Sequence, residues 1–176
     1  MKAIVLVDCQ QDFFPPNGAL AVPESDTIRP VLAKITKMAK EDNIPIIKTM
    51  DCHDTNDPEF KVFPPHCVEG TEGQASIVEC AANKAVVFNK KTYDVFHNEL
   101  GSQEIDGWLK KNKITEVWVA GVCTEICVLA TVKGLCKRGI TTYVFQNAIH
   151  YLKKEDGEKA IKEMKEFGAH FAVAKL

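Results

Sequence analysis

The feature that most constrains the fold is a regular alternation of short apolar runs with longer amphipathic segments. The runs are rich in Val and Ile, and they cover residues 3–7, 44–47, 85–88, 116–120, 141–145 and 169–173. Between them, apolar residues recur at helical spacing in 27–42, 103–112, 125–138 and 156–167. This pattern predicts a three-layer α/β/α fold, in which helices cover both faces of a mainly parallel sheet of about six strands, each buried on both sides.

The length and charge of the chain narrow the function classes. Its 176 residues suit a single domain over 1–176. With 22 Lys and Arg against 24 Asp and Glu and no dense basic block, we expect no nucleic-acid partner. No apolar run approaches the ~18 residues of a membrane span, and the N-terminal run is too short for a signal peptide. We therefore expect a cytoplasmic protein that acts on a small molecule, with its seven cysteines as free thiols and a homo-oligomer left open.

Polar side chains stand where the predicted strands end. Asp8 follows the first strand, Asp51 the second and Lys90 the third, and the fourth leads into a helix start that contains Cys127. Ligands of open parallel sheets bind beyond the carboxyl ends of the strands, so we expect these residues to converge on one site. The irregular segment 51–76 is too long for a simple connection and is expected to be functional.

The sequence GVCTEIC at 121–127 places Cys127 in the first turn of a helix, with Thr124 as its N-cap. The positive end of the helix dipole would lower the pKa of the thiol, and the free amides of this turn could hold an oxyanion. Asp8 could accept the thiol proton, and Lys90 could stabilise the thiolate. The structural alternative makes Cys127 a small buried hydrophobe, Asp8 a loop cap and Lys90 a solvated surface charge.

A second group of residues has the composition of a metal site. Period-two alternation turns Asp51 and His53 to the same side, and His66 stands in a loop that prolines stiffen. One carboxylate and two imidazoles suit Zn²⁺, Fe²⁺ or Mn²⁺ with coordination positions left open. The alternatives are an ordinary hydrogen-bonded turn and, less attractive, a zinc site built on Cys52 and Cys67.

Four aromatic residues lie near these polar candidates in the sequence, namely Phe13, Phe63, Tyr93 and Phe96. They could form the walls of a pocket for a flat ring. Ordinary core packing is the alternative, and it is the better interpretation of Phe96.

Five segments occur in order over residues 8–128: DCQQDF (8–13), TMDCH (49–53), FPPHCVEGT (63–71), KKTYDVF (90–96) and GVCTEICV (121–128). Together they resemble the isochorismatase-like cysteine hydrolases and, within them, the nicotinamidases. The resemblance implies that Asp8, Lys90 and Cys127 are catalytic, with Cys127 as the nucleophile. It also implies an oxyanion hole formed by the backbone amides of Cys123 and Cys127, and a cis peptide bond between Val122 and Cys123.

The same resemblance assigns binding roles. It makes Asp51, His53 and His66 the ligands of one divalent metal, with Zn²⁺ expected and Fe²⁺ or Mn²⁺ as alternatives. Glu59 stands where some nicotinamidases have a fourth ligand, but it ranks low because the loop here is short. Phe13 and Phe63 match the residues that sandwich the pyridine ring.

The implied activity is hydrolysis of nicotinamide to nicotinate and ammonia through a cysteine thioester, as in NAD salvage. One alternative is another cysteine amidohydrolase of the same family, which would act on a carbamoyl compound or a small aromatic amide. The other is a non-enzymatic module with a structural metal.

Overall fold

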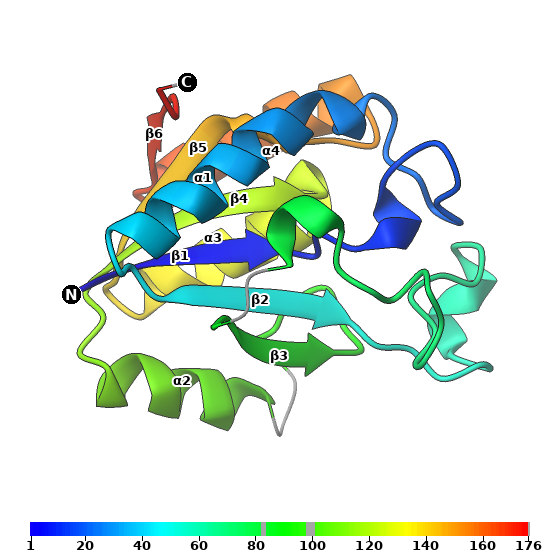
Figure 1. Ribbon diagram of the computed structural model, residues 1–176, viewed down its shortest axis with the longest axis horizontal. Helices are drawn as coiled ribbons and strands as arrows, with labels where there is room; N and C mark the ends of the chain where they lie inside the picture. The colour runs from blue at the N-terminus through cyan, green and yellow to red at the C-terminus, as the bar shows by residue number, and fades with distance from the viewer. Residues whose placement is uncertain (82–83, 98–100, 176) are drawn as a thin grey trace.

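In the part of the chain that the structure describes, six parallel strands form the central sheet, in the order β3-β2-β1-β4-β5-β6 (Figure 1). The computed structural model describes residues 1–81, 84–97 and 101–175, without the side chains of 101–103. Its strands are β1 (Lys2–Val7), β2 (Ile46–Asp51), β3 (Val86–Lys90), β4 (Glu116–Val122), β5 (Thr141–His150) and β6 (His170–Ala172). The sheet confirms the predicted number of strands and their parallel arrangement.

Helices cover both faces of this sheet, as the alternating pattern predicted. Helix α1 (Arg29–Glu41) packs on one face, where it shares an apolar core with Leu6 of β1. The opposite face is covered by α2 (Gly101–Lys111), α3 (Leu129–Lys137) and α4 (Lys154–Glu166). No helix among the described residues is both long enough and apolar enough to cross a bilayer.

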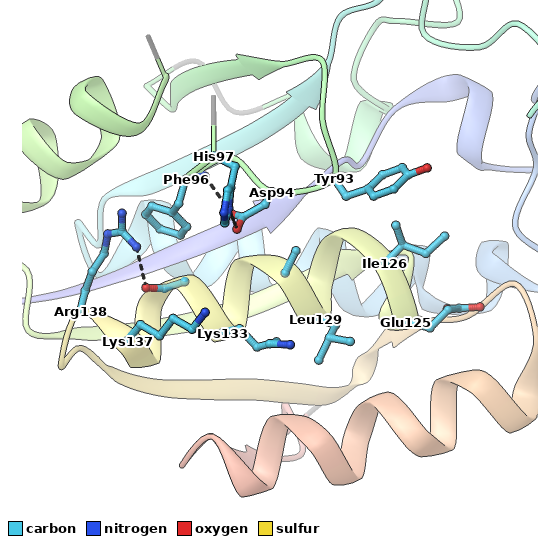
Figure 2. Close-up of a pocket in the computed structure, with 12 residues that line it drawn as sticks. Tyr93, Asp94, Phe96, His97, Glu125, Ile126, Leu129, Lys133, Lys137 and Arg138 are labelled. Carbon is cyan, nitrogen blue, oxygen red and sulfur yellow. Dashed lines mark hydrogen bonds and ion pairs between the residues drawn. The ribbon is translucent and has the colours of Figure 1, made fainter. Parts of the chain in front are cut away.

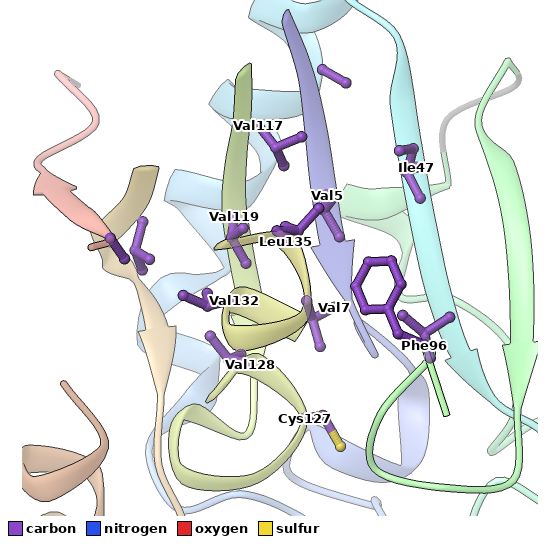
Figure 3. Close-up of a cluster of buried hydrophobic side chains, with 14 of the residues drawn as sticks. Val5, Val7, Ile47, Phe96, Val117, Val119, Cys127, Val128, Val132 and Leu135 are labelled. Atoms are coloured by element: carbon purple, nitrogen blue, oxygen red, sulfur yellow. The ribbon is translucent and has the colours of Figure 1, made fainter. Parts of the chain in front are cut away.

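The core beneath α3 fixes the position of the helix start that contains Cys127. Val7 of β1 and Val119 of β4 face Val128 and Val132, and Figure 3 shows Cys127 beyond the carboxyl end of β1. Burying each such Val side chain stabilises the fold by roughly 1.5–3 kcal/mol. Apolar packing therefore places the thiol at the edge of the sheet.

The edge strands differ from the prediction of strands buried on both faces. Within the described residues β3 has only β2 as a neighbour, and 45% of Val87 is exposed. β6 has three residues, none of them fully buried. A run of Val and Ile does not distinguish a central strand from an edge strand. An edge strand pairs with one neighbour only, so its outer flank stays more exposed than that of a central strand.

The two central strands mark the point at which the chain reverses its direction across the sheet. β1 connects outward to β2, whereas its other neighbour β4 connects outward to β5 on the opposite side. Gly121 of β4 has a φ of +126°, and a Cβ there would overlap the carbonyl oxygen of Val7. Ligand sites of doubly wound sheets form at such a reversal, beyond the carboxyl ends of the strands.

Replacing Gly121 should disrupt this close approach. Gly121→Ala adds a Cβ where the φ is strained and the space is filled, so we expect it to lower the free energy of unfolding by about 2–4 kcal/mol. Gly107→Ala in α2 is the control, because a Cβ there meets nothing within 4 Å, and it should be neutral or stabilise by up to ~1 kcal/mol. Urea unfolding measures both, and equal effects would contradict the role given to Gly121.

Candidate active site

Four candidate residues meet at the carboxyl edge of the sheet. Asp8 directly follows β1, Asp51 ends β2, Lys90 ends β3, and Cys127 lies in a π-helical turn after β4. All four are buried. The register explains the convergence, since Asp51 is paired with Lys90 across β2 and β3, and the Asp8 amide donates to the Thr49 carbonyl at 3.1 Å.

Lys90 is the centre of this cluster. Its Nζ lies 2.8 Å from Asp8 Oδ2, contacts Asp51 Oδ1, and donates to Cys127 Sγ at 3.6 Å. Burial alone would lower the pKa of Lys90, but the Asp51 and Asp8 carboxylates raise it well above its ordinary value. Burial raises the pKa of Asp51, but Lys90 and His53 together outweigh it and lower the pKa of that carboxyl. The cluster thus holds a cationic lysine beside an ionised aspartate.

The proton balance between Asp8 and Cys127 differs from the prediction of a low-pKa thiol. Burial raises the pKa of Cys127 well above its ordinary value, and the opposing effect of Lys90 does not overcome it. Burial also raises the pKa of Asp8, whose Oδ1 accepts a 2.8 Å hydrogen bond from Thr49. Asp8 and Asp51 both lie near the thiol, since one atom of each and Cys127 Sγ lie within 4.8 Å of one another. A thiol of high pKa can react by passing its proton to a neighbouring base, and the transfer from Cys127 to Asp8 stays a prediction.

The turn around Cys127 also differs in detail from the prediction. Thr124 is the first residue of the turn (Thr124–Val128) and not its N-cap, and its buried hydroxyl has no partner among the described residues. The Cys123 carbonyl accepts from the amides of Ile126 and Val128, both at 3.1 Å. The Val122–Cys123 peptide bond is cis, as the resemblance implied. The oxyanion role of the Cys123 and Cys127 amides stays a prediction.

The three candidate metal ligands also come together. Asp51, His53 and His66 each place one ligand atom within 4.8 Å of the others. Both imidazole Nε2 atoms lie 3.9 Å from Asp51 Oδ2, and His53 Nε2 is buried without a hydrogen-bond partner among the described residues. A buried imidazole nitrogen without a partner, facing a carboxylate and a second imidazole, fits a zinc-type ion.

Glu59 lies closer to this triad than its low ranking suggested. Its Oε1 is 3.8 Å from His66 Nε2, and its side chain is half-buried. Cys52 and Cys67 form no three-residue group of metal-ligand side chains within the described part of the chain. All seven cysteines are free thiols, as expected.

The predicted ring-binding residues both border His66. The Phe13 ring lies 5.5 Å from the His66 ring between centroids, and the Phe63 ring lies at 6.3 Å. Sequence reasoning missed Phe60, whose ring lies 5.5 Å from His53 and 5.7 Å from His66. Phe60 could have been identified from its position, because it stands three residues before Phe63 within the segment 51–76 that was expected to be functional.

Two further polar residues that support the site were not anticipated. Gln10 holds the backbone of Asp51 in both directions, since its Nε2 donates to the Asp51 carbonyl at 2.8 Å and its Oε1 accepts from the Asp51 amide at 2.7 Å. Asp57 lies 3.1 Å from His53 Nδ1. In the sequence, only their closeness to predicted site residues pointed to Gln10 and Asp57, because the fold decides which group a polar side chain contacts.

A surface groove of about 540 Å³ lies along α3 (Figure 2). Its lining comes from residues 93–97 and 125–138, including Tyr93, Phe96 and Ile126, but not from Lys90 or Cys127. The groove is therefore separate from the buried charged cluster of Asp8, Asp51 and Lys90.

Comparison with known proteins places this site in context. The family model for the isochorismatase domain matches residues 2–174. The chain belongs to the isochorismatase family. Among solved structures similar to this family member is a pyrazinamidase of Pyrococcus horikoshii in complex with zinc, with a TM-score of 0.90, 33% identity and 98% of each chain covered.

Two nicotinamidases are also similar to this isochorismatase-family hydrolase. The structure from Bacillus subtilis has a TM-score of 0.87 and 30% identity, and the match covers 97% of this chain and 98% of that one. The nicotinamidase of Escherichia coli is 28% identical over 199 residues, which cover 96% of this chain and 92% of that one. These likenesses extend over nearly the whole chain.

Removing the central lysine of this family member should leave two buried carboxylates without their cation. We expect Lys90→Met to lower the free energy of unfolding by about 3–5 kcal/mol, because a broken buried ion pair exposes the full desolvation cost of its partners. The double variant Lys90→Met/Asp8→Asn should recover part of that loss.

Lys91→Met is the matched control, since Lys91 is exposed and pairs with Asp54 at the surface. It should leave stability unchanged. Chemical denaturation compares the variants, and a Lys90→Met protein as stable as the control would show that the buried charges do not depend on Lys90.

Proposed function

We propose that the protein is a nicotinamidase, which hydrolyses nicotinamide to nicotinate and ammonia as a step of NAD salvage. The observation that carries this proposal is the shared position of Asp51. One of its oxygens contacts Lys90 in the Asp8–Lys90–Cys127 cluster, and the other faces His53 and His66. The candidate nucleophile and its partners thus lie directly beside the candidate metal ligands, and the similarity to the zinc-bound pyrazinamidase and to the nicotinamidases supports the proposal.

The first half of the reaction forms a thioester. Asp8 takes the proton of Cys127 as Sγ attacks the carboxamide carbon, and the nearby Lys90 ammonium stabilises the charge that develops on sulfur. The backbone amides of Cys123 and Cys127 hold the oxyanion of the tetrahedral intermediate. The C–N bond then breaks, Asp8 returns the proton to the departing nitrogen, and ammonia leaves.

The second half hydrolyses the thioester with water. Asp8, again ionised, takes a proton from water as the water oxygen attacks the thioester carbon. The C–S bond breaks, and the proton on Asp8 returns to Cys127. The acid product loses its remaining proton to solvent and leaves as nicotinate. Burial raises the pKa of Asp8, which suits a group that must hold a proton in both halves of the cycle.

The remaining residues orient the ring. Asp51, His53 and His66 would hold one divalent ion, with Zn²⁺ first and Fe²⁺ or Mn²⁺ as alternatives, and Glu59 lies within reach of the same group. When bound, this ion supplies a Lewis acid that can accept the pyridine nitrogen and so orient the substrate. Phe13 and Phe63 would enclose the ring.

Ammonia release from a panel of amides tests the activity and the nucleophile together. We expect turnover of nicotinamide, and we expect Cys127→Ala to reduce it by ~10⁴-fold or more, as for the loss of other covalent nucleophiles. Cys123→Ala is the matched control, because it removes a neighbouring buried thiol but keeps the backbone amide. Its effect should be far smaller.

The panel also distinguishes the alternative activity. Hydrolysis of a carbamoyl amine without hydrolysis of nicotinamide would assign the protein to another amidohydrolase of this family. If Cys123→Ala were the inactive variant instead, the nucleophile would be wrong.

Metal content and substrate choice test the ring-binding role. Elemental analysis of the purified protein should find about one divalent transition metal per chain. His53→Ala should lose it, whereas His170→Ala, on the exposed strand β6, should keep it. Chelation should weaken nicotinamide binding, and benzamide, which lacks the ring nitrogen, should be a poor substrate with or without metal. Benzamide hydrolysed as well as nicotinamide would contradict the contact to the ring nitrogen.

A further inference from the structure

Asp57 connects the candidate metal ligands to the turn that follows them. It stands four residues after His53 and directly before a 3₁₀ turn at Pro58–Lys61. Its Oδ2 lies 3.1 Å from His53 Nδ1, and its Oδ1 accepts a 2.9 Å hydrogen bond from the Glu59 amide. One carboxylate therefore contacts the ring of one ligand residue and the backbone of a residue beside the site.

The contact matters because the two nitrogens of His53 face different groups. Nδ1 faces Asp57 in a short ion-pair contact that is not aligned as a linear hydrogen bond, and Nε2 faces Asp51 at 3.9 Å. A neutral imidazole carries its proton on one nitrogen and offers a lone pair on the other. A carboxylate beside Nδ1 favours the proton there, which leaves the lone pair on Nε2.

The second contact acts on Glu59. Asp57 accepts a hydrogen bond from the Glu59 amide and so holds the first turn of Pro58–Lys61. In this turn the Glu59 carboxylate lies 3.8 Å from His66 Nε2. The turn also contains Phe60, whose ring packs against the His53 ring. The same aspartate is thus placed to orient both a histidine ligand and the acidic residue beside the site.

We propose that Asp57 is a positioning residue for the metal site, which fixes the Nδ1–H form of His53 and the placement of Glu59. The inference rests on the proposed function only in that both use the ligands Asp51, His53 and His66. The competing explanation is that Asp57 is only a cap of the short turn, with its contact to His53 incidental.

Three variants separate these explanations. Asp57→Ser keeps a short hydroxyl that can cap the Glu59 amide but is too short to reach His53. Asp57→Asn keeps the size of the side chain, but its single acceptor oxygen can serve only one of the two contacts. Asp54→Asn is the control, because it makes the same change of charge three residues earlier at an exposed carboxylate that pairs with Lys91.

Zinc affinity, measured without substrate by competition with a chromophoric chelator, is the deciding readout. We expect Asp57→Ser and Asp57→Asn to bind Zn²⁺ about 10–100-fold more weakly than the native chain, as for other partners of metal-bound histidines. Asp54→Asn should bind as the native chain does. If Asp57→Ser binds zinc as tightly as the control, Asp57 is only a cap and the inference is wrong.

The NMR tautomer of His53 in the metal-free native chain gives a test that needs no variant. The spectrum is recorded at alkaline pH, where the ring is neutral and its one proton sits on a single nitrogen. A proton on Nδ1 supports the inference, and a proton on Nε2 overturns it.

Failure of this inference is distinguishable from failure of the proposed function. A native chain that binds no zinc would overturn the inference, whereas ammonia release from nicotinamide reports on the activity independently. Loss of zinc affinity in both Asp57 variants would support the inference even if the substrate proved to be another amide.

Discussion

The site depends on one buried ammonium group. Lys90 lies inside the protein with no exposed surface, and an isolated charge there would cost several kcal/mol. Asp8 and Asp51 offset that cost, and they can do so only because β1, β2 and β3 end at the same level of the sheet. The apolar packing on both faces fixes those ends. The fold and the chemistry are therefore linked through the register of three strands, and the buried charges stabilise the arrangement only while all three residues are present.

Asp51 divides its two oxygens between two tasks, and this division sets the layout of the site. One oxygen contacts Lys90, beside Asp8 and Cys127, and the other faces His53 and His66. In the proposed function, the reacting carboxamide and the ion that Asp51, His53 and His66 would hold lie on opposite sides of this carboxylate. Under the proposed function, a pyridine carboxamide would direct its amide carbon to the first group of residues and its ring nitrogen to the second.

The sequence was sufficient for the features that depend on chain pattern. Runs of Val and Ile predicted the strands, and the polar residues at their ends, such as Asp8 and Lys90, predicted where the cluster would form. It was insufficient where the outcome depends on tertiary contacts. The partner of Gln10 is the backbone of Asp51, 41 positions away, and no local signal indicates such a pairing. The pKa of Cys127 was predicted to be low from the helix dipole and from Lys90, whereas burial raises it.

The central claim is that Cys127, held beside Asp8 and Lys90, forms a covalent bond to the carbonyl carbon of nicotinamide. The most direct test is to mix enzyme with excess nicotinamide, quench with acid during turnover, and analyse the digested protein by mass spectrometry. The account predicts a mass increase of one nicotinoyl group on the peptide that contains Cys127, which disappears in Cys127→Ser. A nicotinoyl group on another residue, or sustained turnover with no adduct under conditions that trap a synthetic thioester, would contradict it.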